Sequence, residues 1–164
     1  MIITGMEAYR MGIVEGIINP EKQIQPSGIE LTLRDVERII GVGILDLTDE
    51  KREIPKTEPI PFNSDGKVFL NQGVYKIRYN EIVKIPKDMI AIGYPRSSLI
   101  RSGATIYTAI WDPGYIGRSE SLLQVFNVNG IYLYRNARII QLIFIKVVGK
   151  PHKTYDGKYQ KENI

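Results

Sequence analysis

The sequence predicts a single all-β domain, either a β-sandwich or a β-barrel, preceded by one N-terminal helix. Short runs of β-branched and aromatic residues recur between glycine, proline and asparagine breaks along most of the chain. Apolar residues at helical spacing occur in one segment near the N-terminus. A chain of 164 residues has ordinary single-domain size and is long enough to bury a core. Many short strands with one helix are typical of sandwiches and barrels.

The helix is expected to begin at a capping box formed by Thr4 and Glu7. In such a box the threonine hydroxyl accepts a hydrogen bond from an early backbone N–H, and the glutamate reaches back. Asn19-Pro20 is expected to end the helix, because proline cannot continue it. The apolar residues at helical spacing in between are Met6, Tyr9, Ile13 and Ile17.

Strands are expected at residues 29–33, 68–70, 74–79, 89–94, 122–128, 131–134 and 139–145. Asn129-Gly130 lies between two of them and predicts a tight hairpin, because both residues accept positive φ. The charged segment from Asp49 to Pro61 contains several prolines. We expect it to be an exposed excursion rather than a domain linker, since strand patterns continue on both sides.

The composition excludes several classes of function. The chain has 43% hydrophobic and 24% charged residues, as is usual for a soluble globular protein. Its net charge of +4 comes without a long basic run, so we expect no nucleic-acid partner. The absence of cysteine excludes disulfides and the zinc-dependent nucleoside deaminases, and His152 alone forms no metal cluster. Since no apolar run is long enough for a membrane span and no signal segment is found, a cytoplasmic protein is expected.

Two segments carry residue types that suit phosphate chemistry. In Arg96-Ser97-Ser98, hydroxyls and backbone N–H groups would face one point at the start of a helical turn, and the guanidinium adds paired hydrogen bonds. The alternative is an ordinary serine-capped turn with a surface arginine. Asp112, before Pro113-Gly114, is either a simple turn former or a carboxylate that orients and deprotonates water for attack on a phosphoanhydride.

Three further side chains stand out from their surroundings. Tyr115 lies just past that turn, where its ring either covers a sugar face or packs as a half-buried strand residue. Gln141 interrupts an apolar run, so its amide must bond to neighbouring backbone or to a ligand, since an unpaired buried amide costs about 2 kcal/mol. Glu30 is a carboxylate in a strand, where the simplest interpretation is a solvent-facing position.

In this order, these segments resemble the motifs of the dUTPase and dCTP deaminase superfamily over most of the chain. The family usually has aspartate where this chain has Glu30. The four motifs of the family correspond, in order, to residues 25–31, 95–98, 112–117 and 138–143. The C-terminal lid motif corresponds to residues 157–160. The resemblance implies a jelly-roll-like β fold, a homotrimer with sites at subunit interfaces, and Mg²⁺ held mainly by the nucleotide phosphates.

The resemblance also implies roles for individual residues. In dUTPases the substrate is dUTP, and water attacks the α-phosphorus to give dUMP and pyrophosphate. Backbone groups of an expected hairpin over residues 105–112 would contact the uracil edge. By resemblance, Asp112 is catalytic, Arg96, Ser97, Ser98 and Gln141 hold phosphates, Tyr115 stacks on deoxyribose, and Glu30 is an outer-shell contact of the metal.

The strand after Gly117 indicates to which branch of the superfamily, dUTPase or dCTP deaminase, the chain is more similar. Deaminases resemble one another in having a catalytic glutamate there, where this chain has Leu122 or, with a shifted alignment, Gln124. Neither side chain accepts and returns a proton. The nearest acid, Glu120, lies two residues before Leu122, which is about 7 Å along the strand. This departure favours a dUTPase without deaminase activity. A dCTP deaminase, either monofunctional or forming dUMP directly, and a non-catalytic nucleotide-binding trimer are the alternatives.

The tail is the last segment with an expected role. We expect one domain over residues 1–164, of which residues 152–164 form a mobile lid. Typical dUTPases end in a glycine-rich segment with a phenylalanine that stacks on the base, and this chain has no such motif. Tyr159 is the candidate substitute, and Lys158 would add positive charge near the terminal phosphates. A disordered tail is the alternative.

Overall fold

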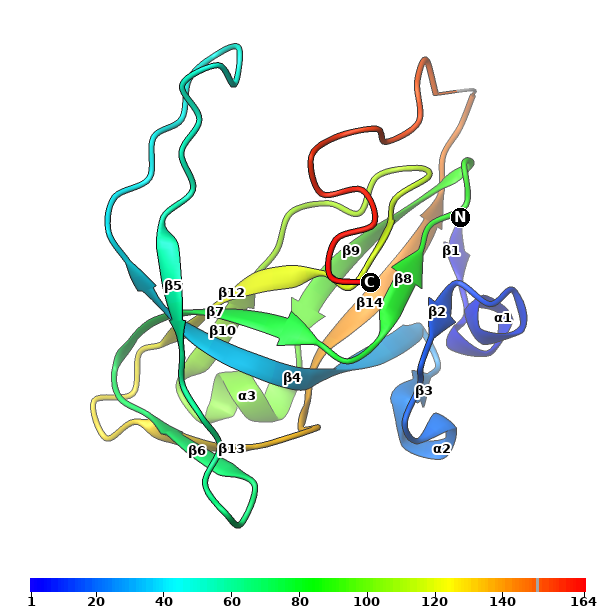
Figure 1. The fold of residues 1–164 in the computed structure, drawn as a ribbon. Helices are drawn as coiled ribbons and strands as arrows, with labels where there is room; N and C mark the ends of the chain where they lie inside the picture. Colours follow the sequence, from blue (N-terminus) through cyan, green and yellow to red (C-terminus); the bar gives the residue numbers. More distant parts are fainter. Residues whose placement is uncertain (150) are drawn as a thin grey trace.

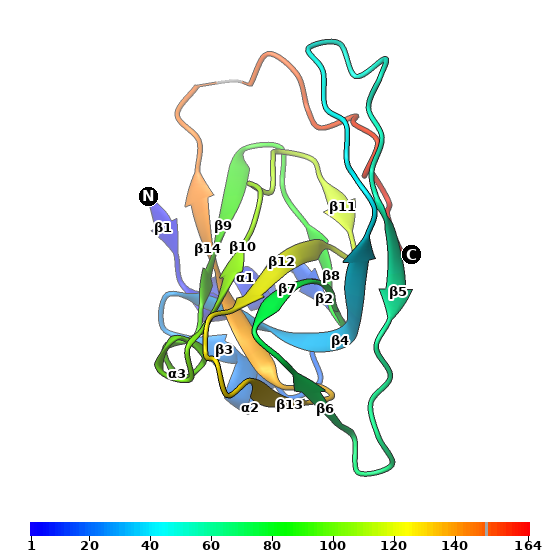
Figure 2. The same ribbon diagram turned by 90° about the vertical axis from the view of Figure 1, so that its left-hand side faces the viewer.

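The computed structural model describes residues 1–149 and 151–164, whose regular secondary structure is mainly β-strand (Figures 1 and 2). The described part of the chain contains the short helices α1 (Gly5–Arg10), α2 (Pro20–Gln23) and α3 (Ser97–Arg101). The strands are β1 (Ile2–Ile3), β2 (Val14–Glu15), β3 (Ile24–Gln25), β4 (Gly28–Ile40), β5 (Lys56–Pro59), β6 (Lys67–Leu70), β7 (Gly73–Tyr79), β8 (Ile82–Lys84), β9 (Met89–Pro95), β10 (Ala104–Tyr107), β11 (Ile116–Gly117), β12 (Glu120–Val125), β13 (Ile131–Tyr134) and β14 (Arg138–Lys146). No helix in these residues is long and apolar enough to cross a membrane.

The main sheet is curled and antiparallel. Its strand order is β1-β14-β4-β7-β12-β10, with β3 and β5 also paired to β4 and β9 also paired to β14. The long β4 crosses this sheet and carries β14 at one end and β7 and β5 at the other (Figure 1). Two small sheets, β11-β8-β2 and β13-β6, complete the described strands. The all-β class predicted from the sequence is therefore confirmed.

The first half of β4 is buried on both of its faces. Every residue from Gly28 to Leu33 is buried, including the polar Glu30 and Thr32. Glycine is required at the start of this strand, because a Cβ on Gly28 would lie 1.8 Å from the carbonyl oxygen of Leu142. The consequence for function is that β4 carries a carboxylate inside the core, where it must be paired.

The N-terminal helix is much shorter than its apolar spacing predicted. The Thr4 hydroxyl does accept from the Glu7 N–H at 3.3 Å, which confirms the start. The helix ends at Arg10, and Gly12 has a φ of +66°. The chain then forms β2, which pairs with β8, so sheet pairing overrides the helical spacing after residue 10. Asn19-Pro20 does not end this helix: it begins α2, with Asn19 as the N-cap and Pro20 in the first turn.

The hairpin predicted at Asn129-Gly130 is also wrong. A turn is present and Gly130 has a φ of +75°, but Asn129 does not share that conformation. β12 already ends at Val125 and pairs with β7 and β10, whereas β13 pairs with β6. The segment between Asp49 and Pro61 is largely exposed, as predicted, and belongs to a long projecting arm that includes β5 (Figure 1).

Candidate active site

A pocket of about 460 Å³ lies where β4, β9, α3 and β14 meet. Its walls come from the first, second and fourth motifs, and include Glu30, Arg96, Ser97 and Gln141. Strand register explains this grouping, because Gln141 on β14 pairs with Glu30 on one side and with Tyr94 of β9 on the other. We call this cavity the phosphate pocket, because its donors are those expected to hold phosphate oxygens.

One buried carboxylate holds both Arg96, which lines the phosphate pocket, and Arg138. Arg96 Nε lies 2.6 Å from Glu30 Oε1, and Arg138 Nη1 lies 2.9 Å from Glu30 Oε2. The Glu30 side chain is 6% exposed, whereas both guanidinium groups are about 30% exposed. Glu30 therefore fixes one edge of each arginine, and Nη1 of each arginine also donates to a backbone carbonyl. The exposed remainder of each guanidinium group can face an anion. Both oxygens of Glu30 are thus engaged by arginines. The outer-shell contact with a metal that is expected for Glu30 remains a prediction.

The second motif forms the predicted helical turn. α3 begins at Ser97, and Arg96 is its N-cap residue without a side-chain cap. Arg96 Nη1 lies 3.5 Å from the Ser98 hydroxyl, so the arginine and the serines adjoin one another. Ser97 and Ser98 are both exposed at this turn. The structure thus brings together the four residues expected to hold phosphates, with Ser98 at the edge of the pocket.

A second pocket, of about 340 Å³, surrounds the third motif. Its lining includes Asp112, Tyr115, Glu120, Tyr159 and Glu162, and we call it the carboxylate pocket. Three of these five residues were predicted site residues. The pocket combines acidic groups with aromatic rings, which suits a water-activating carboxylate beside a sugar or base.

Backbone pairing fixes Asp112 in place. The preceding residue, Trp111, exchanges two backbone hydrogen bonds of 3.0 Å with Ala91 of β9. The turn after it is closed by a hydrogen bond from the Tyr115 N–H to the Asp112 carbonyl, at 3.1 Å. Gly114 occupies this turn with a φ of +86°, which other residues rarely adopt. The exposed Asp112 side chain therefore stands on a rigid turn.

The segment 105–112 is not a separate hairpin. Its first part is β10, which pairs with β12, and its last part pairs with β9 through Trp111. The two halves thus belong to different strand pairs, because the sheet curls between β10 and β9. Contact of its backbone with uracil remains a prediction.

Tyr115 is covered by the C-terminal segment. Its hydroxyl donates to Glu162 Oε1 at 2.7 Å, and its ring lies edge-on to Tyr155, with centroids 5.6 Å apart. Only 6% of Tyr115 is exposed. Burial raises the pKa of the Tyr115 phenol, and the neighbouring Glu162 raises it further. The phenol therefore stays protonated and donates.

The C-terminal segment docks on the third motif. Gln160 is the central contact, since its side chain accepts from the Ile116 N–H and donates to the Gly114 carbonyl. The Lys161 N–H donates to the Ile116 carbonyl at 2.7 Å. Tyr159 lies against the carboxylate pocket, whereas Lys158 is exposed, with its ammonium 5.9 Å from the Tyr159 ring centroid. The lid motion expected for residues 152–164 remains a prediction.

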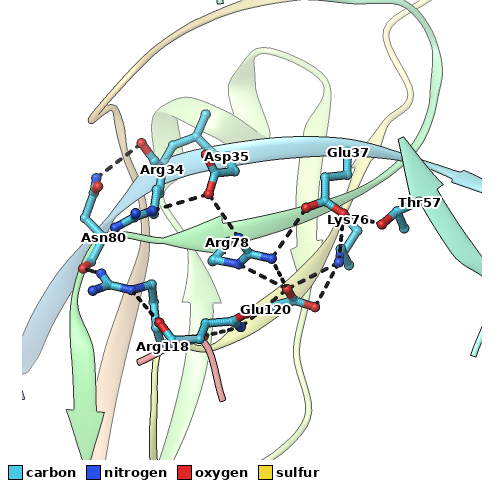
Figure 3. Close-up of polar contacts among 11 residues, drawn as sticks. Arg34, Asp35, Glu37, Thr57, Lys76, Arg78, Asn80, Arg118 and Glu120 are labelled. Carbon is cyan, nitrogen blue, oxygen red and sulfur yellow. Dashed lines mark hydrogen bonds and ion pairs between the residues drawn. The ribbon is translucent and has the colours of Figure 1, made fainter. Parts of the chain in front are cut away.

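Glu120 of β12 lies in a network of charged side chains that also includes residues of β4 and β7 (Figure 3). Its Oε1 accepts from Arg78 Nη2 at 2.8 Å, and its Oε2 lies 3.2 Å from Lys76 Nζ. Glu37 binds the same two cations, and Asp35 binds Arg78. Burial lowers the pKa of the Arg78 guanidinium, but the hydrogen bond with Glu120 and the charges of Glu120, Glu37 and Asp35 together raise that pKa overall. The Glu120 carboxylate is thus committed to two cations.

The two pockets of one chain lie at opposite ends of β9. Trp111, next to Asp112, pairs with Ala91, whereas Arg96 follows the last residue of this strand. Five residues of extended chain span about 16 Å at about 3.3 Å per residue. A water activated by Asp112 must approach phosphorus to within about 3.5 Å. One copy of the chain therefore does not bring Asp112 and the phosphate pocket to the same reacting atom.

Sequence patterns missed two residues at this site. Arg138, which binds Glu30, was not assigned a role, although it begins the fourth motif. Glu162 of the carboxylate pocket was not assigned a role either, and its contact with Tyr115 spans 47 residues. Trp111, the single tryptophan of the chain, directly precedes Asp112, and this was the one signal in the sequence that a buried aromatic ring adjoins the Asp112 turn.

The curled antiparallel sheet and the order of its motifs define a class, the all-β fold of dUTPases and dCTP deaminases. The chain belongs to the dCTP deaminase-like family, whose model matches residues 6–147. A crystal structure of 2′-deoxycytidine 5′-triphosphate deaminase from Agrobacterium tumefaciens has a similar fold, with a TM-score of 0.64 and 19% sequence identity. That match covers 87% of this chain and 47% of the longer deaminase chain.

Archaeal relatives are much more similar in sequence. A probable deoxyuridine 5′-triphosphate nucleotidohydrolase from Methanosarcina mazei is 48% identical, over 92% of this chain and 88% of the relative. A protein of the same name from Archaeoglobus fulgidus is 47% identical, over 99% and 98% of the two chains. These relatives match the present chain over most of their own length.

Proposed function

We propose that this protein hydrolyses dUTP to dUMP and pyrophosphate. The observation that carries the proposal is Asp112, an exposed carboxylate on a rigid turn that lines a pocket with Tyr115 and Tyr159. The names of the archaeal relatives, at 47–48% identity over most of the chain, support the same substrate.

The catalytic unit is a homotrimer in which two copies build each site. Its support is the separation of about 16 Å along β9 between the two pockets of one chain. A three-fold arrangement places the carboxylate pocket of one copy against the phosphate pocket of the next. Arg96, Ser97, Ser98 and Gln141 then hold the phosphates that Asp112 faces across the interface.

Each residue has a defined part in the reaction. Asp112 orients a water in line with the α-phosphorus and accepts its proton, while the bond from that phosphorus to the bridging oxygen breaks. The two guanidinium groups positioned by Glu30 stabilise the charge that develops on the phosphate oxygens. Tyr115 packs on the deoxyribose once the C-terminal segment shifts, and Tyr159 covers the base.

The divalent cation in this proposal is Mg²⁺, carried by the triphosphate. No cluster of three or more acidic, histidine or cysteine residues suited to a metal occurs among the described residues. The phosphate pocket instead offers serine, glutamine and arginine, which suit phosphate oxygens. These residues would fit an ion held by the nucleotide, and Glu30 is the acidic residue that lines the phosphate pocket. The cation neutralises charge on the phosphates.

Deamination of dCTP is the second candidate activity, because the family model is that of dCTP deaminase-like proteins. It requires an acid that exchanges a proton with the base, and Glu120 on β12 is the nearest one. Both carboxylate oxygens of Glu120 are engaged by Lys76 and Arg78, which disfavours that role.

Product analysis distinguishes the two activities. Purified protein with Mg²⁺ is incubated separately with dUTP and dCTP, and nucleotides, pyrophosphate and ammonia are measured. We expect dUMP and pyrophosphate from dUTP and no ammonia from dCTP. Ammonia release that disappears in Glu120→Gln would instead establish deamination.

A further inference from the structure

Trp111 and Ser119 form a buried polar contact beside Asp112. The indole Nε1–H donates to the Ser119 hydroxyl oxygen at 2.7 Å, and the two residues are only 5% and 3% exposed. An indole has one donor and no acceptor, so this hydrogen bond satisfies its whole polar capacity. Both residues also line the carboxylate pocket.

The two partners are anchored to different strands. Trp111 is paired through its backbone to Ala91 of β9, and its ring lies over Gly93, where a Cβ would come within 3.1 Å of the ring. Ser119 directly precedes β12, and its carbonyl accepts from the Tyr79 N–H of β7. The indole therefore links the turn that carries Asp112 to the central part of the sheet.

We propose that Ser119 is a positioning residue that fixes the Asp112 carboxylate through the Trp111 indole. This inference rests on the proposed function, because it requires Asp112 to be the group that activates water. Asp112 itself is exposed on a turn, so the position of its carboxylate depends on its chain neighbours. Trp111 is the neighbour with a fixed side chain, and Ser119 is the acceptor that sets its ring orientation. Without this acceptor the buried indole N–H is unpaired, so the Trp111 ring shifts and the Asp112 carboxylate beside it loses its fixed position on the turn.

The size of the effect follows from geometry. A shift of about 1 Å in a catalytic group lowers the rate about 100-fold. Ser119→Ala should therefore lower kcat by about 10- to 100-fold. The phosphate pocket lies at the other end of β9, so KM for dUTP should change less than about threefold. A general loss of packing would not separate kcat from KM in this way.

Ser121→Ala is the matched control. Ser121 lies on the same strand face two residues further on, and it is 8% exposed. Its hydroxyl has no hydrogen-bond partner among the described residues. This exchange removes the same oxygen from a similar environment, and kcat should stay within about twofold of wild type.

Trp111 provides an independent readout, because it is the single tryptophan of the chain. In Ser119→Ala, we expect a shifted emission maximum and stronger quenching by acrylamide, whereas Ser121→Ala should match wild type. Trp111→Phe removes the indole donor but keeps an aromatic ring. If the hydrogen bond is the link, kcat of Trp111→Phe should fall similarly, and adding Ser119→Ala to it should cause little further loss.

The outcomes separate the two proposals. If wild type releases no pyrophosphate from dUTP, the proposed function fails. If wild type is active but Ser119→Ala keeps its kcat, or loses kcat only in proportion to folded protein measured by circular dichroism, the positioning role fails alone. A double variant whose losses multiply would also overturn it, because the two residues would then act independently.

Discussion

Glu30 Oε1 and Arg96 Nε lie 2.6 Å apart, although 66 residues of chain separate the two positions. The ion pair joins the buried half of β4 to the residue at which β9 turns into α3. Arg138 of β14 binds the other oxygen of the same carboxylate. One buried acid thus sets the direction of two guanidinium groups, of which Arg96 lines the phosphate pocket, so the first motif acts through the second and fourth.

Replacing Glu30 with glutamine should weaken both stability and nucleotide binding. A neutral amide cannot balance two guanidinium charges, and breaking a buried pair typically costs about 3 kcal/mol. We expect this loss in urea denaturation, and about a tenfold rise in KM for dUTP, equivalent to about 1.4 kcal/mol. Glu21→Gln, on the exposed first turn of α2, is the control. An unchanged KM in Glu30→Gln would show that Glu30 does not position the arginines.

Asp112→Asn should abolish turnover but preserve binding. The amide keeps the size and the turn but does not accept the proton of the attacking water, so kcat should fall about 1000-fold. Affinity for the α,β-imido analogue of dUTP, measured by calorimetry, should remain within about threefold of wild type. Full activity in this variant would remove Asp112 from the reaction.

Two inactive variants should restore activity when they assemble together. Arg96→Gln disables the phosphate pocket and Asp112→Asn disables the carboxylate pocket. If neighbouring copies contribute these residues, random trimers of equal composition contain about a quarter of intact sites. Co-expressed and purified mixtures should thus show about a quarter of wild-type activity, while each variant alone shows almost none. No recovery in a confirmed mixed trimer would indicate that each site is built by one copy.

The strands and the motifs could be predicted from the sequence because both depend on local signals. β7, β9, β13 and β14 begin and end within a residue or two of their predicted bounds, since β-branched alternation and turn residues define them. The Thr4 cap was likewise visible in the sequence. The family resemblance groups Arg96, Ser97, Ser98 and Gln141, and three of them, Arg96, Ser97 and Gln141, line the phosphate pocket. Their contact with phosphate remains a prediction.

The errors occurred where a distant partner decides the structure. Ile13 and Ile17 have helical spacing, but pairing of β2 with β8 takes that stretch into the sheet. Asn129-Gly130 has hairpin chemistry, yet β13 pairs with β6, which lies about 60 residues earlier in the chain. Contacts such as Glu30 with Arg138 cannot be read from periodicity, because they arise only when the curled sheet closes.

Glu81 gives the last prediction, on pH and stability. This residue is fully buried, and its carboxylate accepts hydrogen bonds from Gln23 and from the backbone and side chain of Thr32. None of the ion pairs among the described residues includes it. Burial raises the pKa of the Glu81 carboxyl, although the hydrogen bonds from Thr32 and Gln23 offset part of that effect.

The sign follows from linkage between protonation and folding. Because the folded pKa of Glu81 exceeds the unfolded value, the folded state binds this proton more tightly, and ionisation destabilises it. The free energy of unfolding should therefore decrease, at this site, as pH rises above the ordinary glutamate pKa of about 4.3 and through the raised value. Glu81→Gln removes the titration, so its free energy of unfolding relative to wild type should increase over the same pH range. Urea denaturation of both proteins between about pH 4 and pH 8 measures this difference, and a difference independent of pH would mean that Glu81 keeps an ordinary pKa in the folded protein.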